Sequence, residues 1–265
     1  MIEIHTGDSV VVGIDGSAAA VYAAKWAIDE AIARDVPLRL VSCTPHPQSS
    51  DRLGAEYAST CLRAAHAAIE ESAAPVKIET AILEGDPTTS LIEESEHAAM
   101  VCVGSVGIGR FAKAVLGSTA AELAERASCP VAVIRGYTPR RPHPDGSIMV
   151  EVTDWDENHD VIAAAVAEAE LRKRPIVTVG ICPPETGMSA REELQRRTAI
   201  WQDLYPEVQI TSTPTTTSFV QFLGSTAEPN SLVVVGAHDA TDLANIIGSH
   251  ADSDRDNPSV LIVRA

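Results

Sequence analysis

The stretch SVVVGIDGSAAAVYAAKWAIDEAIAR, residues 9–34, decides the fold class, because it places a buried strand directly before an amphipathic helix. Residues 9–14 form a β-branched apolar run, which is typical of a strand covered on both faces. Residues 18–34 carry apolar side chains at helical spacing: Ala20, Ala23, Ala24, Ala27, Ile28 and Ala31. A strand followed by a helix is the repeating unit of a parallel sheet.

The same alternation continues to residue 135. Further strands are predicted at residues 37–43, 77–83, 99–104 and 130–135, and further helices at 56–72, from Pro87 onward, and 118–127. Right-handed crossovers then give an open, doubly wound α/β fold with helices on both faces of the sheet.

After residue 137 the pattern starts again. TPRRPHPDG, residues 138–146, has three prolines and no apolar residue, which is typical of a linker. An ungapped shift of 138 residues lays VVVGID (10–15) on IMVEVT (148–153) and Pro37 on Pro175, and a shift of 132 lays VCVG (101–104) on VVVG (233–236). We predict a duplicated α/β unit with domains at 1–137 and 147–265; a single continuous sheet is the alternative.

Charge and composition exclude several classes of partner. The net charge of −17 is divided into −8 for residues 1–136 and −9 for residues 137–265, so neither half offers a basic face to nucleic acid or to an anionic membrane. The five cysteines include no C-x-x-C pair and indicate reduced, mostly buried thiols. The first residues resemble no signal peptide and no apolar run is long enough to span a membrane, so a cytoplasmic protein is expected.

The residues that could form a binding site lie in GSVGIGRFAKAVLGST, residues 104–119. This stretch begins at the carboxyl end of a predicted strand, the edge at which open α/β sheets bind ligands. Its glycines allow the backbone to approach a ligand, and Gly117-Ser118-Thr119 opens a helix whose N–H groups and dipole favour an anion. The sequence therefore predicts a phosphate cradle, although glycines that serve only turns would explain part of the pattern.

The spacing Gly104-x2-Gly107-x9-Gly117-Ser118 resembles the G-x2-G-x9-G-[S/T] signature of nucleotide-binding universal stress proteins. Three other stretches are similar to that family: VVVGIDGS (10–17), EGDP (84–87) and CPVAVIR (129–135). The resemblance covers nearly all of residues 8–136. It implies five parallel strands per domain in the order 3-2-1-4-5.

The resemblance also implies a binding site for ATP, ADP or cyclic AMP, with or without Mg²⁺. Gly13 and Asp15 would lie beside the adenosine, and Val41 would meet the adenine edge through its backbone. The phosphate and ribose contacts would come from Gly104, Gly107, Gly109, Arg110, Gly117, Ser118 and Thr119. Two alternatives remain open: Arg110 could point to solvent, and Asp15 could serve only as a helix cap or turn residue.

The second half departs from this pattern. Glu151 and Thr153 stand where the shift of 138 places Gly13 and Asp15, and Asp239 stands where the second glycine belongs. Acidic residues then crowd the would-be phosphate end at Asp252, Asp254 and Asp256. The second domain is predicted to keep the fold without the site.

Competing chemistries have weaker sequence support. Residues 107–112 fit G-x-G-x-x-A, but that dinucleotide fingerprint normally follows the first strand and not the fourth. No P-loop is present, and no residue is an evident general base, so no catalytic residue is assigned.

We therefore expect an adenine-nucleotide-binding regulator of a stress response, recognised by a protein partner. A nucleotide-independent partner-binding scaffold is the alternative, and a hydrolase or transferase of the same superfamily is a minor third. The two halves are expected to pair as a pseudo-dimer through their last strands, and a homodimer is a further expectation.

Overall fold

The computed structural model describes residues 8–44, 52–105, 116–135, 146–153, 155–184, 187–226, 230–238 and 258–264. The chain divides near residue 136 into two compact units, and each unit is described by itself. The predicted boundaries at residues 137 and 147, and the linker between them, remain predictions.

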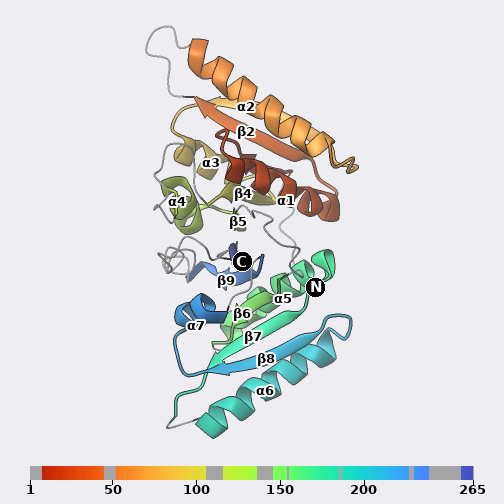
Figure 1. Ribbon diagram of the computed structural model, residues 1–265, viewed down its shortest axis with the longest axis vertical. Coiled ribbons are helices and arrows are strands. Elements are labelled where there is room, and N and C mark those ends of the chain that lie inside the picture. The colour runs from red at the N-terminus through yellow and green to blue at the C-terminus, as the bar shows by residue number, and fades with distance from the viewer. Residues whose placement is uncertain are drawn as a thin grey trace. The chain divides into compact units, whose positions relative to one another are not determined.

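The first unit alternates strands with helices (Figure 1). Its elements are β1 (Val10–Gly13), α1 (Ala18–Arg34), β2 (Leu38–Thr44), α2 (Arg52–Glu70), β3 (Ile78–Glu84), α3 (Pro87–Ser95), β4 (Met100–Gly104), α4 (Ser118–Arg126) and β5 (Val131–Ile134). All pairings are parallel, and they give the order β3-β2-β1-β4-β5. The predicted topology of this unit is confirmed.

Helix α1 begins and ends where its local sequence predicts. The Ser17 hydroxyl accepts a hydrogen bond from the Ala20 amide and caps the first turn. At the other end Asp35 adopts the left-handed conformation, with φ of 54°, and its amide bonds to the last carbonyls of the helix. Pro37 then starts the extended chain of β2.

Two layers of helices cover the first sheet. Helices α1 and α2 pack against each other on one face, and α3 and α4 pack against each other on the opposite face. The alanine stripe of α1 is fully buried, and its small side chains let the helix approach the sheet closely. A Cβ atom on Gly104 would lie 2.8 Å from both the carbonyl carbon and the Cβ of Ala19, so β4 requires glycine at this position.

The second unit repeats the topology of the first. Its elements are β6 (Ile148–Glu151), α5 (Trp155–Arg172), β7 (Ile176–Ile181), α6 (Gly187–Leu204), β8 (Ile210–Thr215), α7 (Phe219–Thr226), β9 (Leu232–Gly236) and β10 (Ser259–Val263). Parallel pairing gives the order β8-β7-β6-β9-β10, which is again 3-2-1-4-5.

Hydrogen bonds confirm the shift of 138 residues between the units. The Val10 amide bonds to the Pro37 carbonyl, and the Ile148 amide bonds to that of Pro175, both at 2.9 Å. Lys173, the counterpart of Asp35, has a φ of 53°. The same backbone geometry therefore connects the first helix to the second strand in both units.

Differences from the predicted elements are confined to their ends. Helix α2 begins at Arg52, four residues before the prediction, and most strands are one or two residues shorter than their apolar runs. No disulfide joins the five cysteines, and four of them are buried. Within the described ranges, no helix combines the length and the apolar character needed to cross a membrane.

Candidate functional site

A cavity of about 330 Å³ lies at the carboxyl end of the first sheet, where β1, β2 and β4 end. Its walls include residues from α2 on one face of the sheet and from α3 and α4 on the other. Strand β2, which the chain reaches from β1 through α1, and strand β4, which it reaches from β3 through α3, pair with β1 on opposite sides. The cavity therefore occupies the topological switch point of the sheet, the usual ligand position in this architecture.

The structure brings together seven of the ten residues expected at the site. All seven line this cavity: Gly13, Asp15, Val41, Gly104, Gly117, Ser118 and Thr119. The other three, Gly107, Gly109 and Arg110, lie outside the described residues.

The turn between β1 and α1 holds Asp15 at the cavity. Gly16 has a φ of 88°, a conformation that favours glycine and explains the Asp-Gly pair. An oxygen of the Asp15 carboxylate accepts a hydrogen bond from the Ser17 amide at 2.9 Å, which forms an Asx turn. The helix cap is thus Ser17 and not Asp15, and the exposed Asp15 side chain borders the cavity.

The three helices that begin beside the cavity have different caps. Ser17 caps α1, and the Asp86 carboxylate caps α3 by accepting from the Thr89 amide at 3.0 Å. Helix α4 begins at Ser118, and its N-cap residue, Gly117, has no side chain to cap the first turn. Within the described residues, the N–H groups at the start of α4 therefore lie at the cavity without a competing side-chain cap.

Gly13 and Gly117 face different constraints from Gly104. A Cβ on Gly13 would lie 3.0 Å from Leu91 Cδ1, a flexible side-chain end. Among the described residues, a Cβ on Gly117 would meet only the Ser105 carbonyl, at 3.5 Å, and the φ of −72° suits any residue. No described residue requires glycine at position 117, and a ligand that approaches the backbone would be a sufficient reason for it.

Sequence reasoning missed several residues of the cavity, above all Tyr57 of α2, Cys43 of β2 and Leu91 of α3. Burial raises the pKa of the Cys43 thiol, so this side chain is a neutral wall and not a nucleophile. The missed residues are brought in by tertiary packing. Only Leu91 had a sequence signal, because it lies one turn after Pro87 on a predicted helix.

The described residues offer no dedicated metal site at this edge. Within them, no group of three His, Cys, Asp or Glu side chains is arranged to hold a metal ion. Among the described residues that line the cavity, Asp15 is the one carboxylate. A divalent ion in this cavity would depend on oxygens supplied by a ligand.

A larger hollow of about 620 Å³ lies between α2 and the edge strand β3, away from the expected residues. It is lined by Ser59, Leu62, Arg63, His66, Ala67, Glu70, Thr80, Ala81 and Ile82. Because it opens along the flank of an edge strand and lacks glycines or a helix N-terminus, size alone does not make it the better candidate.

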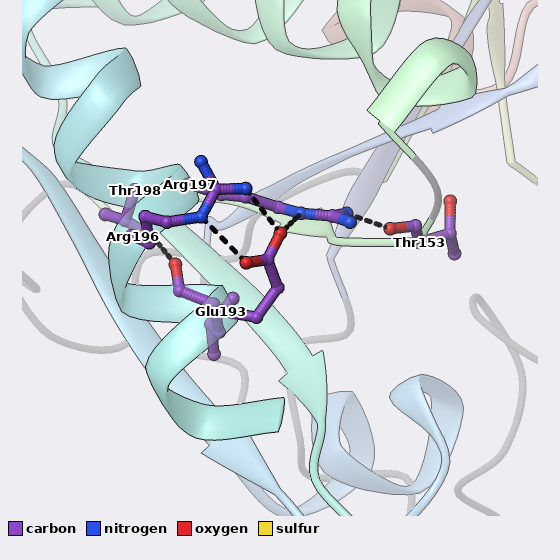
Figure 2. A network of polar contacts seen from close by, with 6 residues as sticks. Thr153, Glu193, Arg196, Arg197 and Thr198 are labelled. Carbon is purple, nitrogen blue, oxygen red and sulfur yellow. Dashed lines mark hydrogen bonds and ion pairs between the residues drawn. The ribbon is translucent and has the colours of Figure 1, made fainter. Parts of the chain in front are cut away.

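In the second unit, a side-chain network reaches the turn that corresponds to Asp15 (Figure 2). Arg197 of α6 donates a hydrogen bond to the carbonyl of Thr153. Its guanidinium also bonds to Glu193 at 2.7 Å, and Arg196 holds the same carboxylate through two further bonds. These two arginines lower the pKa of Glu193 to about 2 through hydrogen bonding and charge.

The other departures of the second unit are only partly described. Glu151 ends β6 at the position of Gly13, as the sequence predicted. Asp239, Asp252, Asp254 and Asp256 lie outside the described residues.

Comparisons with known proteins agree on one family. Residues 7–135 match the model of the Universal stress protein family. Universal stress protein Rv2624c of Mycobacterium tuberculosis is 42% identical over 265 residues, which cover 98% of this chain and 97% of that protein. Universal stress protein Rv3134c of the same organism is 41% identical over 245 residues, covering 89% and 90%.

Solved structures show the same fold over the whole chain. A universal stress protein from Archaeoglobus fulgidus superimposes with a TM-score of 0.70 at 14% identity, covering 100% of this chain and 98% of that one. A putative universal stress protein from Pseudomonas aeruginosa gives 0.59 at 18% identity, with coverage of 98% and 94%.

Proposed function

Since the chain belongs to the universal stress protein family, we propose that its first unit binds one adenine nucleotide in the cavity at the carboxyl edge of β1, β2 and β4. The observation that carries the proposal is the convergence of seven expected contact residues on one cavity. They come from segments more than 100 residues apart in the sequence.

The adenosine end of the site would lie between β1 and β2. Val41 presents its backbone here, and its carbonyl accepts the Ile14 amide at 2.7 Å. A carbonyl oxygen has a second lone pair, so the amino group of adenine can still donate to it. Asp15 would accept from the ribose hydroxyls with the carboxylate oxygen that the Ser17 amide does not use.

The phosphate end would lie at the start of α4. The uncapped N–H groups and the side chains of Ser118 and Thr119 supply donors, and the helix dipole supplies partial positive charge. Because the cavity has one carboxylate and no metal cluster within the described residues, Mg²⁺ would enter as a complex with the phosphates.

The second unit would act as a structural or partner-binding domain. Glu151 adds bulk and charge where adenosine would lie, and Arg197 engages the turn from within the protein. The whole protein would then be a cytoplasmic regulator whose nucleotide state is recognised by a partner during stress, with at most slow hydrolysis.

The test is isothermal titration of the full chain with ATP, ADP, AMP, cyclic AMP and NAD, together with mass spectrometry of nucleotide that co-purifies. We expect about one adenine nucleotide per chain. Binding of NAD without any adenine mononucleotide would contradict the proposal, and so would binding of none of the five, which would favour the nucleotide-independent scaffold.

A further inference from the structure

Tyr57 connects helix α2 to the turn that carries Asp15. Its hydroxyl donates a hydrogen bond to the Asp15 backbone carbonyl at 3.1 Å, across 42 residues of sequence. The side chain also lines the cavity, and 53% of it remains exposed. A large aromatic residue that is half exposed and yet bonded at the mouth of a cavity is placed to contact whatever enters there.

The neighbouring turn of α2 supports this arrangement. Cys61 lies one turn after Tyr57 and is buried. Its contact with the phenol raises the pKa of Tyr57, and the charge of Asp15 raises it further. The phenol therefore remains protonated, and remains a donor, at any physiological pH.

The second unit contains a counterpart of this contact. The buried faces of the two helices align at an offset of 136, because Ala58, Leu62 and Ala65 of α2 match Leu194, Thr198 and Trp201 of α6. At that offset Tyr57 corresponds to Glu193 and Cys61 corresponds to Arg197. Both pairs of side chains are in contact within their own helix.

Each helix also bonds to the backbone carbonyl at the equivalent position of its own unit. Arg197 donates to the carbonyl of Thr153, and Thr153 is the residue that the shift of 138 places on Asp15 (Figure 2). In both units, a side chain of the second helix therefore donates a hydrogen bond to the turn after the first strand, and we call this contact the bridge. The side chains that form it are unrelated. One bridge uses an ion pair, and the other uses an aromatic ring that borders a cavity.

The position of the Tyr57 ring indicates which end of the nucleotide it would contact. Helix α2 packs on β2 and β3, whereas α4 packs on α3 and β5, on the other face of the sheet. The phosphate-binding turn of α4 and the Tyr57 ring are therefore on opposite sides of β1. A ring at the β2 side would meet a base and not a phosphate.

We propose that Tyr57 is a specificity-determining residue that covers the base of the bound nucleotide and holds the Asp15 turn in place. The inference rests on the proposed nucleotide site and adds a selection for the base. Stacking on a purine uses the face of the ring, while the hydroxyl keeps its bond to the turn.

Two variants and two probes test this inference. Tyr57→Phe keeps the ring and removes the bridge, so dissociation of ATP should become about threefold to tenfold faster. Tyr57→Ala removes both, so the affinity for ATP should fall about tenfold or more, while the affinity for inorganic tripolyphosphate stays unchanged. The same two substitutions at Tyr22, an exposed tyrosine of α1 that does not line the cavity, are the matched controls.

Each other outcome is informative. If the wild type binds no adenine nucleotide, the proposed function fails and this inference fails with it. If the wild type binds ATP and both Tyr57 variants bind it with the same affinity and the same dissociation rate, only this inference is overturned. Equal losses for ATP and tripolyphosphate would mean that Tyr57 acts through the fold. Should Tyr57→Ala unfold, the dissociation rate of the Tyr57→Phe variant decides.

Discussion

The hydroxyl of Thr88 donates a hydrogen bond to the hydroxyl of Thr119 at 3.1 Å, and this bond joins the first turns of α3 and α4. Thr88 is buried, whereas Thr119 lines the cavity. In the proposed site, the Thr119 side chain would therefore be oriented toward a phosphate by a second helix.

Replacing Thr88 by valine tests that orientation. Valine keeps the shape and leaves the Thr119 hydroxyl without its donor, so the free energy of unfolding should fall by about 1 kcal/mol. The affinity for ATP should fall about threefold to tenfold, as measured by titration calorimetry. Thr60→Val is the control, since the Thr60 hydroxyl donates to the Glu56 carbonyl and accepts from Arg63, both in its own helix. Equal ATP affinity in the Thr88 variant would show that Thr119 needs no such support.

Two glycines of the site should respond in opposite ways to alanine. Gly104→Ala places a Cβ 2.8 Å from Ala19, so it should lower the melting temperature strongly. Gly117→Ala meets only ordinary contact distances and should fold like the wild type, but it should bind ATP more weakly. Thermal unfolding and calorimetry on both variants separate the two effects. A stable Gly117→Ala variant with full affinity would mean that no ligand approaches this backbone.

Gly117→Glu extends the same experiment. A carboxylate against the phosphates should abolish binding, while the space around Gly117 leaves the fold intact. Binding that survives this change would place the phosphate site elsewhere.

The Glu193 network predicts a pH dependence of stability. The pKa of Glu193 in the folded protein, about 2, lies below its ordinary value of 4.5, so the unfolded chain binds the proton more tightly. The stabilising contribution is therefore complete above about pH 4.5 and is lost as the pH falls toward 2. Urea unfolding between pH 6 and about pH 3 should show a wild-type advantage over Glu193→Gln that shrinks on acidification. Glu192→Gln, on the same helix, is the control, and a constant difference across this range would contradict the assignment.

The second unit should bind no nucleotide. In the full chain carrying Gly117→Glu, titration with ATP should give no signal, with or without Mg²⁺. The titration with Mg²⁺ is needed because clustered carboxylates such as Asp252, Asp254 and Asp256 can share a divalent ion with phosphates. Residual stoichiometric binding would mean that the repeat kept a working site.

The arrangement of the two units is a further prediction. The strands Val131–Ile134 and Ser259–Val263 are apolar and are each the last strand of their unit, so we expect them to pair within the chain as a pseudo-dimer. Nuclear magnetic resonance relaxation should give one common tumbling time for both units. Independent tumbling would exclude the pseudo-dimer, and light scattering that shows a strict monomer at high concentration would exclude a homodimer.

Most of the fold could be predicted from the sequence because its signals are local. The β-branched run before the alanine face of α1, the cap at Ser17 and the proline at position 37 act within a few residues of where they lie. The glycine spacing likewise located one wall of the cavity. Tyr57 and Cys43 could not be predicted, since their place beside Asp15 depends on how α2 and β2 pack, and no periodicity encodes that.

Gly104 and Gly117 belong to one sequence signature, yet their surroundings constrain them differently. The first is required by the backbone of α1, which would collide with any side chain, and the second unit keeps Gly236 at the equivalent position although Glu151 and Thr153 replace Gly13 and Asp15. Selection for a stable domain alone would preserve the first glycine in a descendant that no longer binds anything. The second unit also has Gly248-Ser249, so the last glycine does not by itself separate the two domains either. A genome survey that sorts such domains should therefore score the positions of Gly13 and Asp15, where the second unit has Glu151 and Thr153.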